Sequence, residues 1–233
     1  MHINANEIHV WSADLETSPY QQNTDFLSQD ECERANRFKF PIHRQRFIAA
    51  RSLLRAIISF YTDVSPAKII FSYNDDKKPF LQNVPLMFNL SHSDHMVVYA
   101  FTMQYAIGVD IEKIQSEYHE GVAERFFSKQ ENEALHHLPK DKQASFFYQI
   151  WAYKEAIIKA IGKGFSLPLS SFPISFINGS ARIMIDDVSW SLFPLTIHPD
   201  YQSAVVTNQQ VSRITYWKFV NTIPCLDKVE NVV

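Results

Sequence analysis

Two carboxylates in one short segment are the first residues of this chain whose types and spacing could support chemistry. Asp110 and Glu112 lie in an apolar, strand-like run at 106–112. Side chains alternate along a β-strand, so both carboxylates share one face with Gly108. Adjacent carboxylates raise each other's pKa unless a cation lies between them, and Mg²⁺ prefers oxygen ligands. An isolated pair of this kind is more often the wet, acidic face of a strand, so the magnesium interpretation needs support from elsewhere in the chain.

The second candidate pair is Glu155 and Lys159, which are four residues apart in a helical pattern. Residues four apart share one face of a helix, and an apolar stripe that includes Trp151 gives this helix a buried side. The pattern ends at Gly162 and Gly164, because glycine is typical of a helix end. A surface ion pair would have the same spacing. The functional hypothesis is that Glu155 is a third carboxylate on the metal and that Lys159 holds a phosphate bridged to it.

Basic side chains gather on and before a long predicted helix at 43–61. The arginines concerned are Arg34, Arg37, Arg44, Arg46, Arg51 and Arg55. Arginines on a solvated helix face are ordinary, and a phosphate-rich anion is an equally good explanation for so many. A nucleic acid is a further candidate partner. It is disfavoured because the net charge of the chain is -3, whereas non-specific nucleic-acid binders are usually basic.

Composition places the chain among globular proteins with a sizeable core. It has 233 residues, of which 46% are hydrophobic and 14% aromatic, enough for one large domain or two compact halves. Its two cysteines, Cys32 and Cys225, have no metal-ligand spacing and indicate a reducing compartment. The first residues lack the pattern of a signal peptide, and the apolar runs are too short to span a bilayer. We therefore expect a soluble, cytoplasmic protein.

Hydrophobic periodicity predicts a mixture of helices and strands, and hence an α+β fold. Strands are expected at 7–14, 68–73, 85–91, 95–102, 106–112, 172–177, 181–185, 189–195, 203–207 and 213–220. Helices are expected at 43–61, 120–127, 129–137 and from about 142 to 161. A further helix begins at Ser28, which forms a capping-box pattern with Glu31. The pair Asn178-Gly179 predicts a two-residue hairpin turn.

A loose parallel between the two parts of the chain hints at two similar α+β halves. In each part an Arg-Phe pair precedes a long, aromatic-rich helix and then strands, with Arg37-Phe38 in the first part and Arg125-Phe126 in the second. The expected boundaries are 1–104 for the N-terminal half, 105–222 for the C-terminal half and 223–233 for a flexible tail.

Four spaced segments carry most of the candidate residues. They are Phe88-Asn89-Leu90-Ser91-His92-Ser93, Gly108-Val109-Asp110-Ile111-Glu112, Arg125-Phe126-Phe127-Ser128, and Trp151-x-x-Lys154-Glu155-x-x-x-Lys159 followed by Gly162-Lys163-Gly164. In this order they closely resemble the Sfp-type 4′-phosphopantetheinyl transferases. The resemblance extends to Arg37-Phe38-x-Phe40, Arg46-Phe47-x-x-x-Arg51, Lys78-Pro79 and Ser166-Leu167-Pro168-Leu169. Each motif alone is weak, and the ordered set, which spans most of the chain, is strong.

The resemblance implies an enzyme that moves the phosphopantetheine arm of coenzyme A onto a serine of an apo acyl-carrier or peptidyl-carrier protein. Mg²⁺ would be the cofactor, and adenosine 3′,5′-bisphosphate would leave. The family also implies a monomer with two pseudo-twofold halves, coenzyme A in the crease between them, and carrier docking on the C-terminal half. We expect no nucleic-acid partner and no membrane. The alternative is an inactive carrier-binding module of the same fold, against which the intact carboxylate and lysine set argues.

The resemblance also implies roles for single residues. Asp110, Glu112 and Glu155 would hold Mg²⁺ on the pyrophosphate, and Lys159 would neutralise a phosphate oxygen. Glu155 is the family's favoured base for the carrier serine, although a bound cation lowers the pKa of a carboxylate. Asp110 or a metal-bound water could serve instead. The expected contacts to coenzyme A are Arg46, Arg51, Lys78, Ser91, His92 and Lys159.

The sequence departs from the family pattern at three positions outside the expected metal ligands. Lys77 stands where glycine often precedes the lysine of a Gly-Lys-Pro motif, Ala152 replaces a hydroxyl-bearing residue, and His43 stands where an acidic residue is frequent. Lys154 is about a quarter-turn of helix away from Glu155, so a structural role for it is as consistent with its position as a role in the site.

Overall fold

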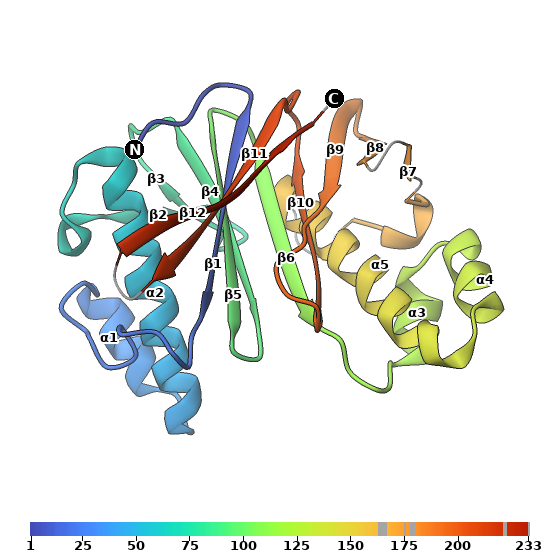
Figure 1. Ribbon diagram of the computed structural model, residues 1–233, viewed down its shortest axis with the longest axis horizontal. Helices are drawn as coiled ribbons and strands as arrows, with labels where there is room; N and C mark the ends of the chain where they lie inside the picture. Colours follow the sequence, from blue (N-terminus) through green and yellow to red (C-terminus); the bar gives the residue numbers. More distant parts are fainter. Residues whose placement is uncertain (163–166, 175, 178–179, 221–222, 233) are drawn as a thin grey trace. The chain divides into compact units, whose positions relative to one another are not determined.

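The structure is a computed structural model, and it describes residues 1–162, 167–174, 176–177, 180–220 and 223–232. The chain divides into two compact units (Figure 1). Unit 1 comprises Met1–Met87, His95–Gln104 and Val211–Val233, and unit 2 comprises Phe88–Asp94 and Tyr105–Gln210. The expected division into 1–104 and 105–222 treats each half as one continuous segment. The structure instead exchanges short segments between the units, because strand neighbours are chosen by long-range packing that local periodicity does not encode.

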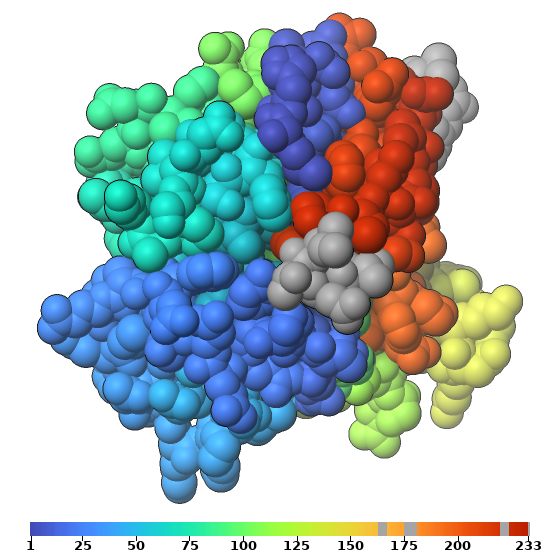
Figure 2. All heavy atoms as spheres, turned by 60° about the vertical axis from the view of Figure 1, so that its left-hand side comes forward, coloured from blue at the N-terminus to red at the C-terminus, as the bar shows by residue number. Residues whose placement is uncertain are grey.

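Unit 1 is built on a β-sheet that joins the two ends of the chain. The sheet has the strand order β12-β11-β1-β5-β4, and β4 starts with two residues of unit 1. The bounds are β1 Glu7–Asp14, β4 Leu86–Ser93, β5 Met96–Met103, β11 Arg213–Val220 and β12 Ile223–Asn231. Because β1 runs parallel to β11, dark-blue N-terminal residues lie beside red C-terminal ones on the surface in Figure 2. A separate short hairpin pairs β2 (Phe71–Tyr73) with β3 (Pro79–Leu81).

The prediction of a flexible tail at 223–233 is wrong for the residues that the structure describes. Strand β12 pairs antiparallel with β11 along its length. Two side-chain contacts support this pairing: Lys218 Nζ donates to Asp227 at 2.5 Å, and the Tyr216 hydroxyl donates to Glu230 at 2.8 Å. Charged residues are common on edge strands, so a polar segment at the end of a chain has the same composition whether it is a tail or an edge strand.

Unit 1 has two α-helices among its described residues. They are α1 (Gln29–Asn36) and α2 (Pro41–Thr62), and a 3₁₀ turn follows at Pro66–Lys68. The predicted long helix is therefore confirmed. It packs through aromatic side chains, because Tyr61 stacks on Phe101 with ring centroids 5.3 Å apart, and the Tyr99 hydroxyl donates to the Ala50 carbonyl at 2.7 Å.

Unit 2 has a second five-stranded sheet with one long helix against it (Figure 1). The strand order is β6-β10-β9-β8-β7, and the pairs are antiparallel. The bounds are β6 Ile107–Lys113, β7 Phe176–Ile177, β8 Ser180–Ile185, β9 Val188–Pro194 and β10 Tyr201–Thr207. The helices are α3 Glu120–Phe126, α4 Lys129–His137 and α5 Lys140–Ile161, with a 3₁₀ turn at Leu169–Ser171.

The predicted end of the long helix is confirmed at Gly162. This residue is left-handed, with φ 74°, and its N–H donates to the Ile158 carbonyl at 2.8 Å. The second predicted glycine, Gly164, and the predicted hairpin turn at Asn178 and Gly179 lie outside the described residues. Within the described ranges, no helix has both the length and the apolar character needed to cross a membrane.

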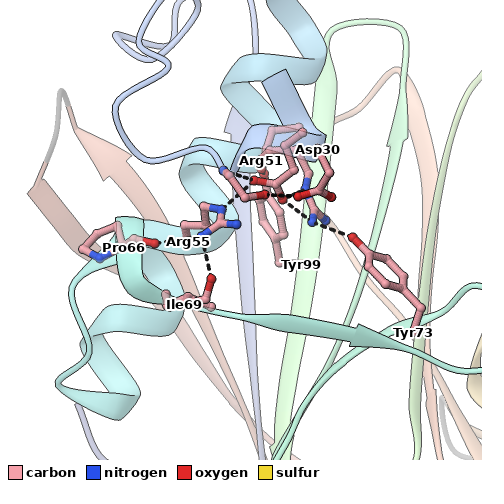
Figure 3. Close-up of polar contacts among 10 residues, drawn as sticks. Asp30, Arg51, Arg55, Pro66, Ile69, Tyr73 and Tyr99 are labelled. Carbon is pink, nitrogen blue, oxygen red and sulfur yellow. Dashed lines mark hydrogen bonds and ion pairs between the residues drawn. The ribbon is translucent and has the colours of Figure 1, made fainter. Parts of the chain in front are cut away.

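Unit 1 contains a buried ionic clamp between its two helices (Figure 3). Glu31 of α1 is 3% exposed. Its two carboxylate oxygens accept from Arg51 Nε and Arg55 Nε of α2, each at 2.7 Å. Arg55 also donates to the carbonyls of Pro66 and Ile69 at 2.9 and 2.8 Å. The clamp therefore ties α1, α2 and the segment after α2 together.

Unit 2 contains a clamp of the same kind, with lysine in place of arginine. Lys154 of α5 is fully buried, and its Nζ lies 2.9 Å from a carboxylate oxygen of Glu131 on α4. The same Nζ donates to the carbonyls of Leu169 and Phe172 at 2.8 and 3.2 Å. A structural role for Lys154 is therefore the correct one of the two interpretations.

The two clamps are built in the same way, which shows that the two units are similar. Glu31 and Glu131 are each the last residue of a Ser-x-x-Glu capping box. The helices that supply the buried cations, α2 and α5, are both 22 residues long, and each cation also reaches carbonyls at or just after a 3₁₀ turn that follows its helix. The predicted α+β fold with two similar halves is confirmed at this level.

Candidate active site

Gly108 allows helix α5 to lie directly on strand β6. A Cβ on this residue would be 2.2 Å from the carbonyl oxygen of Ala156 and 2.2 Å from the backbone nitrogen of Ala160. No side chain fits such a contact, so only glycine permits the approach. The two alanines directly follow Glu155 and Lys159, and Gly108 shares its strand face with Asp110 and Glu112. The close contact therefore brings the two sequence-predicted pairs together within unit 2.

Asp110 is at the centre of the resulting cluster. Its carboxylate is 1% exposed. One oxygen, Oδ1, accepts from Lys159 Nζ at 2.5 Å and from the Ser91 hydroxyl at 2.7 Å, and Lys159 also donates to the Ser91 oxygen at 2.8 Å. The other oxygen, Oδ2, is buried and has no hydrogen-bond partner in the described part of the chain. A buried carboxylate oxygen without a partner is costly, and a water or a cation would satisfy it.

The electrostatics of the cluster show a shortage of positive charge. Burial raises the pKa of Asp110, and the neighbouring Lys159 only partly opposes this. Burial, followed by repulsion from Asp110, raises the pKa of Glu112 to about 7. Burial and the same repulsion raise the pKa of Glu155. Three carboxylates thus share one lysine, and a cation placed among them would relieve all three shifts.

These carboxylates fit a hard cation in their chemistry. They offer oxygen donors only, which suit Mg²⁺, and Asp110 Oδ2 is an available ligand atom. Among the described residues, no three His, Cys, Asp or Glu side chains are already arranged around a common metal position. Here the Asp110 carboxylate is instead engaged with Lys159.

A row of polar side chains on β4 completes the cluster. We call Asn89, Ser91 and Ser93 the β4 polar row; they alternate with Leu90 and His92, so they share one side of the strand. The Asn89 side-chain oxygen accepts from the Val109 N–H at 2.9 Å. The Ser93 hydroxyl donates to Glu112 at 3.2 Å and accepts from the Lys113 N–H at 3.1 Å.

The row also explains why residues 88–94 belong to unit 2: their side chains satisfy polar groups of β6. The sequence analysis attached no role to Asn89 or Ser93. The available signal was the period-two spacing of polar residues in an otherwise apolar strand.

The predicted nucleotide contacts other than Ser91 and Lys159 belong partly to unit 1 and partly to unit 2. His92 is exposed at the end of β4, within unit 2. In unit 1, Arg46 lies 2.5 Å from Glu16, and burial lowers the pKa of Lys78 to about 8. Arg51 is engaged by Glu31 in the clamp, an arrangement that favours a structural role for it.

Unit 1 also has a basic cavity of about 560 Å³, lined by Arg34, Arg37, Phe38 and Lys77. Lys77 has a left-handed backbone, with φ 61°. This conformation is the one that favours glycine, which gives a physical reason for the glycine that the family often has at this position. The lysine found here adds a cation to the cavity at the expense of backbone strain.

Comparison with known proteins assigns the chain to a family. A family model described as the 4′-phosphopantetheinyl transferase superfamily matches residues 106–209, and one described as the N-terminal part of 4′-phosphopantetheinyl transferase matches residues 10–104. The chain is 35% identical over 209 residues to the 4′-phosphopantetheinyl transferase HetI of Nostoc sp., covering 86% of this chain and 87% of the relative.

Two relatives from Bacillus subtilis support the same assignment. The chain is 37% identical over 193 residues to the transferase ffp, covering 79% of this chain and 85% of ffp. It is 36% identical over 184 residues to the transferase Sfp, covering 77% of this chain and 81% of Sfp. The chain therefore belongs to the 4′-phosphopantetheinyl transferase superfamily, as the ordered motifs predict.

Proposed function

We propose that this protein transfers the 4′-phosphopantetheine arm of coenzyme A to a serine hydroxyl of an apo acyl-carrier or peptidyl-carrier protein. The observation that carries the proposal is the cluster of buried Asp110 with half-buried Glu112, Glu155 and Lys159, in a chain that belongs to this transferase family. The inactive carrier-binding alternative is disfavoured because such a protein would not need to keep three mutually repelling carboxylates, one of them buried.

The reaction is a phosphoryl transfer. The serine oxygen of the carrier attacks the pyrophosphate phosphorus that bears the pantetheine arm, and the bond from this phosphorus to the bridging oxygen breaks. The serine proton passes to a base, and adenosine 3′,5′-bisphosphate leaves with the bridging oxygen. Negative charge spreads over the phosphate oxygens in the transition state, so the protein contributes mainly positioning and positive charge.

Asp110, Glu112 and Glu155 are the residues that would hold Mg²⁺. Support comes from the partnerless Oδ2 of Asp110 and from the raised pKa values of all three carboxyl groups. When bound, the cation supplies charge stabilisation for the pyrophosphate.

Lys159 serves two partners in this scheme. Without ligands its Nζ neutralises Asp110. If the three carboxylates held a cation, Asp110 would not need this neutralisation, and Lys159 would be able to donate to a phosphate oxygen of coenzyme A instead. The side chain keeps 28% of its surface exposed, which leaves it accessible to such a ligand.

Glu155 is the residue that we favour to receive the serine proton. A cation held by the same carboxylate would lower its pKa, so the choice of Glu155 rests on the family pattern and on the engagement of the other candidate. Asp110 is the less suitable candidate, since Ser91 and Lys159 already donate to its Oδ1.

The nucleotide end of coenzyme A requires several cations, because its 3′-phosphate is a dianion. Arg46, Lys78 and His92 remain our candidates, with Ser91 near the pyrophosphate. We add the basic cavity of unit 1, whose cations are Arg34, Arg37 and Lys77.

The proposal is tested by mixing the protein with coenzyme A, Mg²⁺ and a panel of apo acyl-carrier and peptidyl-carrier proteins. Mass spectrometry should show a gain of about 340 Da on one or more carriers, the mass of the transferred arm. Carriers that bind without any gain in mass would support the inactive-module alternative instead.

Variants connect the activity to the cluster. Asp110→Ala and Glu155→Gln should abolish transfer while the fold is retained, and Lys159→Ala should chiefly weaken engagement of the pyrophosphate. Glu133→Gln, on an exposed face of α4, is the matched control and should transfer normally. Near-normal rates in the Asp110 or Glu155 variant would refute the site. We also propose that the enzyme is a cytoplasmic monomer, which gel filtration and cell fractionation would check.

A further inference from the structure

Each carboxylate on β6 has its own serine on β4. Ser91 donates to Asp110 at 2.7 Å, and Ser93 donates to Glu112 at 3.2 Å. The match follows from geometry, because both pairs of residues are two apart on their strands and side chains repeat with period two. Ser91 is already among the expected coenzyme A contacts, whereas Ser93 is not.

The hydroxyl proton of Ser93 has one direction available to it. A serine hydroxyl has one proton to donate and can accept through its lone pairs, whereas an ionised carboxylate can only accept. Ser93 therefore donates its proton to Glu112 at 3.2 Å, while its oxygen accepts from the Lys113 N–H at 3.1 Å. Ser91 has the same polarity, since Lys159 donates to its oxygen at 2.8 Å while its proton goes to Asp110.

The hydrogen bond from Ser93 orients the carboxylate of Glu112. Glu112 is a flexible side chain at the partly buried end of β6, and the hydrogen bond to Oε2 fixes the plane of its carboxylate. Groups that hold metal ligands in this way commonly affect metal affinity about 10–100-fold when they are removed.

We propose that Ser93 is a positioning residue of the metal site, which orients Glu112 for a divalent cation through the hydrogen bond from its hydroxyl. The inference rests on the proposed function, because it assumes that Glu112 is a ligand. Ser93 itself touches neither the cation nor the substrate; it acts through Glu112.

The experiment measures binding of Mn²⁺, a spectroscopic substitute for Mg²⁺, by the loss of the free-ion signal in electron paramagnetic resonance. Ser93→Ala should raise the dissociation constant about 10–100-fold. Ser93→Thr keeps the hydroxyl and should bind nearly as the unmodified protein does. Ser203→Ala is the matched control: this buried serine pairs with Ile111 on the adjacent strand, and its hydroxyl donates to the Leu195 carbonyl at 2.8 Å.

Turnover provides a second readout. In Ser93→Ala the Mg²⁺ concentration for half-maximal rate should rise, while kcat at saturating Mg²⁺ stays close to that of the unmodified protein, because the ligands themselves remain. A purely structural role would lower kcat without this shift. Thermal unfolding of the Ser93 variants should show that the fold is kept, as expected for a partly exposed residue near the end of β4.

The outcomes separate the inference from the proposed function. If the unmodified protein binds no Mn²⁺, the metal ligands of the proposed function fail and the inference fails with them. If the unmodified protein binds Mn²⁺ and Ser93→Ala binds as well as Ser203→Ala, the inference alone is overturned. Equal weakening in Ser93→Ala and Ser93→Thr would also overturn it, because packing rather than the hydrogen bond would then be responsible.

Discussion

Replacement of Lys154 by methionine tests the clamp of unit 2 most directly. Methionine keeps much of the volume of the lysine stem, so the change removes the charge and its hydrogen bonds and opens little space. Lys154 Nζ has three oxygen partners, on Glu131, Leu169 and Phe172. Burial lowers the pKa of Lys154 despite the neighbouring carboxylate, as expected for a cation removed from water.

The expected loss in the free energy of unfolding depends on the partners that Glu131 keeps after the substitution. Removing one partner of a buried ion pair costs about 3–5 kcal/mol, because the other charge stays buried and unpaired. Glu131 would still accept from the N–H groups of Ser128 and Ile174, at 2.7 and 2.9 Å. These bonds continue to stabilise its charge, so we place the loss at the lower end, about 3 kcal/mol. That corresponds to a fall in Tm of roughly 6–12 °C for a domain of this size.

The assay is urea unfolding of Lys154→Met, with Lys129→Met as the control. Lys129 forms an ion pair with Glu133 on the surface of α4, where the two side chains are 89% and 57% exposed. Exposed pairs of this spacing contribute about 0.3–0.5 kcal/mol, so the control should unfold almost as the unmodified protein does. A loss below about 1 kcal/mol for Lys154→Met would refute the claim that a buried ion pair holds α5 to α4.

Three further predictions concern single residues of the site and its surroundings. Gly108→Ala places a Cβ 2.2 Å from the Ala156 carbonyl, so it should lower the free energy of unfolding by about 1–3 kcal/mol. It should also reduce transfer, because α5 has to move. Unchanged stability in thermal unfolding would contradict the close contact. Lys77 has a left-handed backbone, with φ 61°, so Lys77→Gly should stabilise the protein by about 1 kcal/mol. The KM of this variant for coenzyme A should rise if the basic cavity binds the nucleotide. Mn²⁺ affinity should fall by at least about tenfold per pH unit below 7, since Glu112, with its pKa raised to about 7, must lose a proton to bind the ion, and the pKa values of Asp110 and Glu155 are raised as well. A flat profile between pH 5 and 7 would contradict the carboxylate site.

Much of the local structure could be predicted from the sequence, and so could the faces of the strand and the helix on which the site residues lie. The alternation of Gly108, Asp110 and Glu112 placed the carboxylates on one face, and the spacing of Glu155 and Lys159 placed them on one face of a helix. Both predictions depend only on the periods of strands and helices. The strand at 7–14 and the helix at 129–137 also match the structure, because their caps and periodicity are local signals.

The remaining features depend on residues far apart in the chain. Arg51 looked like a phosphate ligand, and only its contact with Glu31, 20 residues away, indicates that it holds the helices of unit 1 together. Lys154 was equally ambiguous until its carbonyl partners at Leu169 and Phe172 were known. A charged side chain has the same appearance in a sequence whether it is solvated, paired or bound to a ligand, since its environment is made by other segments.

By itself the sequence determined most of the elements, the faces on which the carboxylates and the lysine lie, and the family to which the ordered motifs point, whereas strand β12 escaped it. The tertiary structure decided that α5 rests on the bare backbone of Gly108, that Lys159 meets Asp110, and that Ser93 holds Glu112. The physical reason is that periodicity acts over a few residues, whereas the charge balance of a buried site is set by which strands and helices pack together.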